Sequence, residues 1–118
     1  MKTTFIFLLF SLLLISCERD NYLIPRKEVP DWLKTQIARD EKEIKDDPKS
    51  GKDIGAWFRY EYKGEYYFEY ENMISSAFPP VYYFNGNLMN TYEEPYIDYM
   101  NKKCCKQIVW KGKYYTIV

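Results

Sequence analysis

Residues 57–70 read WFRYEYKGEYYFEY, two runs of alternating aromatic and charged residues on either side of a Lys-Gly step. Such alternation is typical of two antiparallel strands joined by a tight turn, so we predict a central β-hairpin here. A two-residue loop at Lys63-Gly64 would pair Tyr60 with Tyr67 and place charges on both faces of the hairpin. A three-residue loop ending at Gly64 gathers aromatic rings on one face and uses the glycine for the left-handed residue of a bulge. We therefore predict the three-residue loop.

Two later stretches also predict hairpins. Residues 81–89 place Asn85-Gly86 between apolar residues, and this dipeptide favours a two-residue type I′ turn. Residues 107–118 repeat the Lys-Gly-aromatic pattern of the first hairpin and predict another one. Between them, residues 90–103 carry mixed charge and predict an irregular connection with one helical turn near Tyr96 to Met100.

One helix is predicted ahead of these hairpins, from Pro30 to just before Pro48. Proline suits the first position of a helix, and Asp31 suits the positive end of the helix dipole. The apolar residues of this segment recur at helical spacing and form one inner stripe: Trp32, Leu33, Ile37 and Ile44. We therefore predict an α+β fold, in which this N-terminal amphipathic helix packs on an antiparallel sheet of five to six strands built from hairpins. A chain of 118 residues leaves room for one such domain, over residues 30–118.

The first residues of the chain resemble a bacterial lipoprotein signal. Lys2 precedes an apolar run from Phe5 to Ile15, which is too short to remain as a membrane-spanning helix. The following Leu14-Ile15-Ser16-Cys17 is similar to a lipobox. The resemblance implies that residues 1–16 are a signal peptide and that Cys17 becomes the lipidated first residue, attached to the membrane through its acyl chains. The alternative is a buried N-terminal helix with an incidental cysteine.

The residues after Cys17 are expected to tether the domain to the envelope. Residues 17–29 are the predicted lipidated N-terminus and tether, and within them Tyr22 to Val29, with Pro25, predicts an extended spacer. The acidic cluster at residues 18–20 resembles the surface-export signals of lipoproteins from Bacteroidetes-type bacteria, although a plain polar tether is the alternative. We expect anchoring at the outer membrane, and both the periplasmic and the surface orientation stay open.

A wider resemblance covers residues 1 to about 70. The order of signal, lipobox, Val29-Pro30-Asp31-Trp32-Leu33 and Tyr60-Glu61-Tyr62-Lys63-Gly64-Glu65-Tyr66-Tyr67 resembles small lipoproteins of unknown function found in Bacteroidetes-type bacteria. That family implies an envelope location and a small domain, and it implies no activity.

The composition disfavours several functional classes. The 17 basic and 17 acidic residues cancel, so the charge that nucleic-acid binding requires is missing. The chain has no histidine, which removes the usual general base and the commonest metal ligand. We therefore expect no nucleic-acid partner, no cofactor and no metal, and a binding or inhibitory module rather than an enzyme.

Tyrosine is the most promising residue type for binding, because the chain has 13 of them. Strand neighbours point to opposite faces, so some phenol rings should reach the surface away from the helix. An exposed stripe of such rings suits a protein or a glycan ligand. The candidates are Tyr67, Tyr82, Tyr83, Tyr114 and Tyr115.

Two other groups of residues carry possible chemistry. Cys104-Cys105 could form a vicinal disulfide, an intermolecular bridge or a soft-metal site, although a metal would need further ligands. The alternative is an unremarkable strand entrance with one cysteine in the core. Glu93, Glu94 and Asp98 could serve a small carboxylate-dependent hydrolase, or they could be a solvated acidic loop. A structural component of an envelope complex is the remaining possibility.

Overall fold

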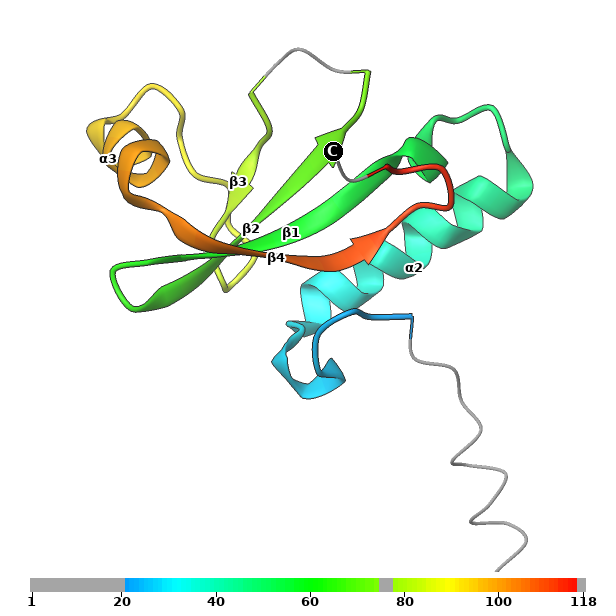
Figure 1. Ribbon diagram of the computed structural model, residues 1–118, viewed down its shortest axis with the longest axis horizontal. Helices are drawn as coiled ribbons and strands as arrows, with labels where there is room; N and C mark the ends of the chain where they lie inside the picture. Colours follow the sequence, from blue (N-terminus) through cyan, green and yellow to red (C-terminus); the bar gives the residue numbers. More distant parts are fainter. Residues whose placement is uncertain (1–20, 75–77, 117–118) are drawn as a thin grey trace, which may run out of the picture.

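The structure is a computed structural model of the chain, and it describes residues 21–74 and 78–116. Over these residues the fold is α+β, with two α-helices and a four-stranded antiparallel sheet in the order β3-β2-β1-β4 (Figure 1). The elements are η1 (Arg26–Glu28), α2 (Asp31–Asp46), η2 (Lys52–Ile54), β1 (Gly55–Tyr62), β2 (Glu65–Asn72), β3 (Val81–Tyr82), α3 (Glu94–Lys102) and β4 (Cys104–Lys111). The signal peptide, the lipidated Cys17 and the acidic cluster that the sequence predicts lie outside the described residues.

The sheet is covered on both faces, which makes a three-layer arrangement. On one face, α2 contributes Leu33 and Ile37 to a core with Trp57 and Phe68 of the sheet. On the other face, α3 contributes Tyr96 and Tyr99 to a core with seven further residues: Ala56, Phe58, Tyr60, Tyr62, Tyr67, Val81 and Met89. Figure 1 shows the two helices on opposite sides of the sheet. Both faces of the central strands are therefore interior.

The predicted three-residue loop of the central hairpin is wrong. Tyr60 pairs with Tyr67 and Tyr62 with Glu65, which leaves a two-residue turn at Lys63-Gly64. Both turn residues have positive φ, 49° for Lys63 and 77° for Gly64, as a type I′ turn requires. The prediction assumed one aromatic and one solvated face. That assumption fails because a helix covers each face.

The observed register buries two charges, and each has partners. Glu69 is 0% exposed, and its Oε2 accepts hydrogen bonds from the Tyr99 hydroxyl at 2.6 Å and from Lys103 Nζ at 2.8 Å. Arg59 is 3% exposed on the opposite face, where Gln107 holds its guanidinium. Charged groups tolerate burial when they are paired and hydrogen-bonded, so the register is compatible with a packed core on both faces.

The predicted two-residue turn at Asn85-Gly86 is also wrong. Tyr83 N–H donates to the Asn87 carbonyl at 2.8 Å, which leaves a three-residue loop with Gly86 at a φ of 95°. The Trp32 indole Nε1 donates to the Phe84 carbonyl at 2.8 Å and holds this loop against α2. A tertiary contact of this kind overrides the local preference of an Asn-Gly pair.

The hairpin predicted over residues 107–118 is wrong as well. After β4 the chain runs on beside the start of β1, where Gly112 N–H donates to the Gly55 carbonyl and Tyr114 N–H to the Asp53 carbonyl, both at 2.8 Å. A Cβ at Gly112 would overlap the Asp53 carbonyl, so this glycine permits a close approach rather than a turn. The described residues consequently form four strands, not five or six.

The predicted N-terminal helix is confirmed, whereas the predicted extended spacer and the predicted irregular connection are wrong. α2 ends at Asp46 and buries Leu33 and Ile37, as the periodicity predicts. The segment expected to be a spacer instead packs on the α2 side of the sheet, with Ile24 7% and Val29 3% exposed. The irregular connection contains α3, a full helix rather than one turn. Its start carried a signal, because Glu94 and Pro95 suit the first turn of a helix.

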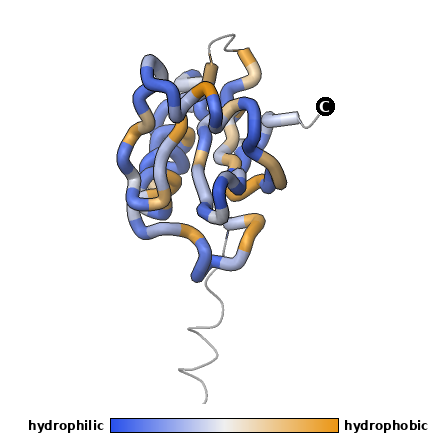
Figure 2. The backbone as a smooth tube through the Cα atoms, turned by 90° about the vertical axis from the view of Figure 1, so that its left-hand side faces the viewer, coloured by the Kyte–Doolittle hydropathy of each residue, from blue (hydrophilic) through white to orange (hydrophobic). Residues whose placement is uncertain are grey.

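No helix among the described residues is long and apolar enough to cross a membrane. Figure 2 agrees, because hydrophobic and hydrophilic residues intermingle along the described chain.

Candidate functional site

The tyrosines predicted to form a binding face are mostly covered. Tyr67 lies on the face away from α2, as expected, but it is 6% exposed because α3 packs over that face. Tyr82 packs with the α2 core, and Tyr83 and Tyr115 pack against the α3 core, each half-buried. Tyr114, at 59% exposed, is the open one of the five. The expectation of an exposed stripe is therefore wrong for Tyr67 and is not met by its neighbours.

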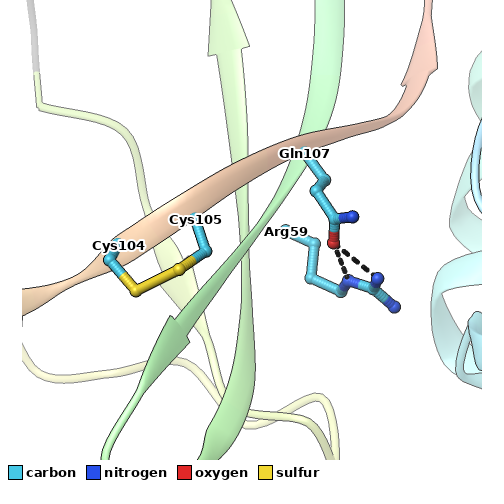
Figure 3. Close-up of a disulfide and its surroundings, with 4 residues drawn as sticks. All are labelled: Arg59, Cys104, Cys105 and Gln107. Carbon is cyan, nitrogen blue, oxygen red and sulfur yellow. Dashed lines mark hydrogen bonds between the residues drawn. A yellow bond between two sulfur atoms is a disulfide. The ribbon is translucent and has the colours of Figure 1, made fainter.

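The two cysteines instead mark an open site at the edge of the sheet. Cys104 and Cys105 are joined in a disulfide between adjacent residues, at the start of β4 (Figure 3). Both residues are exposed, so the alternative in which one of them belongs to the core is wrong.

A bulge in β4 places the disulfide. Arg59 pairs with Gln107 and Glu61 with Cys104, so two steps along β1 correspond to three steps along β4. Cys105 has a φ of 66°, in the left-handed region that non-glycine residues rarely adopt. Bulges of this kind redirect side chains at sheet edges. Here the bulge brings both sulfur atoms beside the Glu61 carboxylate.

Arg59 provides the main polar anchor next to the disulfide. Its Nε and Nη2 donate to Gln107 Oε1 at 3.0 and 2.5 Å, and Figure 3 shows the two side chains extending together from neighbouring strands. Its guanidinium carbon lies 4.1 Å from the centre of the Tyr66 ring, a cation–π contact. Glu28 of η1 forms an ion pair with Nη1 at 3.6 Å, beyond hydrogen-bond length. The Nη1 atom is buried and has no hydrogen-bond partner among the described residues.

These groups line one surface pocket of about 570 Å³ between η1 and the sheet edge. Its lining comprises Pro25, Glu28, Arg59, Glu61, Tyr66, Cys105, Lys106 and Gln107. The Lys106 ammonium lies 4.2 Å from the centre of the Phe58 ring and 3.5 Å from Glu71, on the α3 side of the sheet. The pocket therefore offers the hydrogen-bond donor of Arg59 and the carboxylate of Glu61 side by side with an apolar disulfide.

The sequence signal for this pocket is the alternation of charged residues with rings in residues 57–62, and this pattern predicts solvent exposure. Charged residues that alternate with rings in a strand usually face water. The two-residue turn sets the pairing of β1 with β2, and this pairing places Arg59 and Glu61 on the same face of the sheet as Phe68. The alternation within residues 57–70 does not show this by itself. Glu28 and Tyr66 join the site through folding alone.

The three acidic residues proposed for hydrolysis are only partly brought together. Glu94 and Asp98 line a second pocket of about 400 Å³ with Tyr62, whereas Glu93 does not line it. Asp98 accepts a hydrogen bond from Tyr62 and an ion pair from Lys102 at 2.9 Å. These contacts, the Tyr62 hydrogen bond foremost, hold the pKa of Asp98 below its usual value. A general acid needs a raised pKa, so the lowered pKa disfavours Asp98 as the acid of a hydrolase.

Comparisons of this chain with family models, with curated proteins and with solved structures find no match.

Proposed function

We propose that this protein is a lipid-anchored module of a bacterial cell envelope, and that it binds a protein ligand in the pocket beside Arg59. The lipobox at residues 14–17 supports the anchor. The buried Nη1 of Arg59, which has an ion pair with Glu28 but no hydrogen bond among the described residues, carries the proposal of a binding site. Buried polar groups in folded proteins almost always find a partner, so Nη1 can donate a hydrogen bond to an acceptor that a ligand brings.

The chemistry of the pocket favours peptide groups over sugar rings. A protein loop or chain end presents a carbonyl, which can accept from Arg59, and an amide or cationic group, which can donate to Glu61. A sugar would need an open aromatic ring on which to stack. The Tyr66 ring already faces the Arg59 guanidinium at 4.1 Å, so that surface is occupied.

The site can be tested by photo-crosslinking in living cells that carry the full chain. Tyr66 lines the pocket, and replacing it with the photoreactive benzoylphenylalanine exchanges one aromatic side chain for another. The same replacement at Tyr114 is the matched control, because Tyr114 is exposed and does not line the pocket. We expect a protease-sensitive adduct at position 66 and none at position 114. Equal labelling at both positions, or an adduct that resists protease, would refute a protein ligand in this pocket.

The anchor needs a separate experiment. Cys17→Ala should abolish labelling by a fatty-acid probe and leave a soluble or unprocessed precursor, because Cys17 is the acceptor that the lipobox defines. Ser16 and the rest of the signal stay intact in this variant. Robust acylation of the Cys17→Ala chain would show that the anchor lies elsewhere, without affecting the crosslinking result.

A small carboxylate-dependent hydrolase is the second candidate, because Glu94 and Asp98 share a pocket. It ranks lower because Tyr62, Lys102 and Lys63 already engage Asp98. A panel of chromogenic glycosides and esters tests it: turnover that is lost in Asp98→Asn would favour the enzyme. A structural component of an envelope complex is the third candidate, and a stoichiometric partner that copurifies without crosslinking would favour it.

A further inference from the structure

Three metal-binding side chains meet at the bulge of β4. One carboxylate oxygen of Glu61 and the Sγ atoms of Cys104 and Cys105 all lie within 4.8 Å of one another. The pairing of Glu61 with Cys104 across β1 and β4 fixes this arrangement. No hydrogen bond or ion pair among the described residues engages the Glu61 carboxylate. The cysteines are exposed and Glu61 is half-buried, so an ion can reach all three from solvent.

We propose that the reduced form of this protein binds one Zn²⁺ through Cys104, Cys105 and Glu61. Thiolates and carboxylates are both established zinc ligands, at about 2.3 Å for sulfur and about 2.0–2.2 Å for oxygen. In a tetrahedral site these lengths place the two sulfur atoms about 3.8 Å apart and each sulfur about 3.6 Å from the oxygen. On reduction the two sulfur atoms therefore move apart to this separation, while the Glu61 oxygen, within 4.8 Å of both, needs only a small inward movement. The fourth position is left to water.

The same geometry makes the site dependent on redox state. A disulfide holds its two sulfur atoms at about 2.05 Å and leaves neither as a thiolate, so the oxidised pair cannot act as two zinc ligands. Reduction by a dithiol transfers two electrons and two protons to the Cys104–Cys105 bond, and the dithiol becomes a disulfide in turn. Zn²⁺ then displaces the two thiol protons and forms two zinc–sulfur bonds.

The third ligand is what the sequence could not show. Two adjacent cysteines supply too few donors for a stable zinc site, and a chain without histidine lacks the usual complement. Glu61 lies 43 residues before Cys104 in the chain and reaches it only through strand pairing. The zinc site shares Glu61 and Cys105 with the proposed ligand pocket, but zinc binding does not depend on that ligand.

Zinc binding can be measured by competition with a chromophoric chelator, with Zn²⁺ alone as the probe. The full chain should carry Cys17→Ala, because Cys17 is the third cysteine and its thiol would otherwise compete. A gain of two mass units after dithiol treatment verifies that the disulfide is reduced. We expect one Zn²⁺ per reduced chain and none per oxidised chain, a comparison that needs no substitution within the site.

Variants then assign the ligands. Cys104→Ser and Cys105→Ser should each weaken binding by more than about a hundredfold, and Glu61→Gln by about ten- to a hundredfold. Glu65→Gln is the matched control, because Glu65 is an exposed carboxylate on β2 outside the cluster, and it should bind like the parent chain. Equal zinc binding by the reduced and oxidised chains would overturn the proposal. An unchanged affinity in Glu61→Gln, or a disulfide that resists reduction in the folded protein, would do so too.

Discussion

Truncating Tyr67 is the sharpest test of the three-layer fold, because the sequence suggests that this residue is a surface tyrosine and the structure buries it. Tyr67 is 6% exposed, and its ring centre lies 5.1 Å from that of Tyr99 in α3 and 5.6 Å from those of Tyr62 and Tyr83. Removing a buried aromatic side chain costs about 3–5 kcal/mol, of which each ring pair accounts for about 0.5–1.5 kcal/mol. We expect Tyr67→Ala to fall in this range. That is a large share of the about 5–15 kcal/mol that stabilises a typical domain.

Urea unfolding of the purified chain, followed by circular dichroism, measures this loss. With a slope of about 2 kcal/mol per molar, the midpoint should fall by about 2 M. Tyr114→Ala is the matched control, because Tyr114 is 59% exposed and its loss should stay within about 0.5 kcal/mol. A Tyr67→Ala cost below about 1 kcal/mol would show that α3 does not cover this face, and it would restore the exposed tyrosine surface as a candidate.

Three further predictions test the turn, the buried charge and the tyrosines. Gly64→Ala should destabilise the protein by about 1–2 kcal/mol, because Gly64 has a φ of 77°; an unchanged urea midpoint would refute the type I′ turn. Glu69→Gln should cost about 3 kcal/mol, and combining it with Lys103→Met should cost less than the sum of the two; strict additivity would show that the 2.8 Å ion pair contributes nothing. Burial first, and then the nearby Glu69, raise the pKa of Tyr60 and Tyr99 above the ordinary 10.0. The phenols of Tyr60 and Tyr99 lose their protons at a lower pH in the unfolded chain than in the folded one. The free energy of unfolding should therefore stay constant below pH 10 and fall as the pH rises above 10. A free energy of unfolding that stays constant above pH 10 would contradict the burial of both phenols.

Local sequence determined the elements whose signals lie within one segment. The helical spacing of Leu33 and Ile37 predicts α2, because an amphipathic stripe specifies both the helix and the side that packs. Alternation over residues 57–70 predicts β1 and β2, because a two-residue period within one segment specifies a strand. The adjacent cysteines at residues 104 and 105 allow a vicinal disulfide from sequence alone, since that pairing needs no folding to bring them together.

Tertiary structure decided the register, the layers and the site. Local sequence favours a three-residue loop ending at Gly64 and a two-residue turn at Asn85-Gly86, and the structure has the reverse. The burial of both sheet faces permits the two-residue turn at Lys63-Gly64, and the contact of Trp32 with the second loop holds that loop in its three-residue form. That register turns Arg59 toward η1 and sets Glu61 beside the cysteines. A charged residue in an alternating strand has the same local pattern whether it faces water or a helix. Only the packing of distant segments, which sequence spacing does not encode, makes Arg59 a buried donor and Glu61 a neighbour of two sulfur atoms.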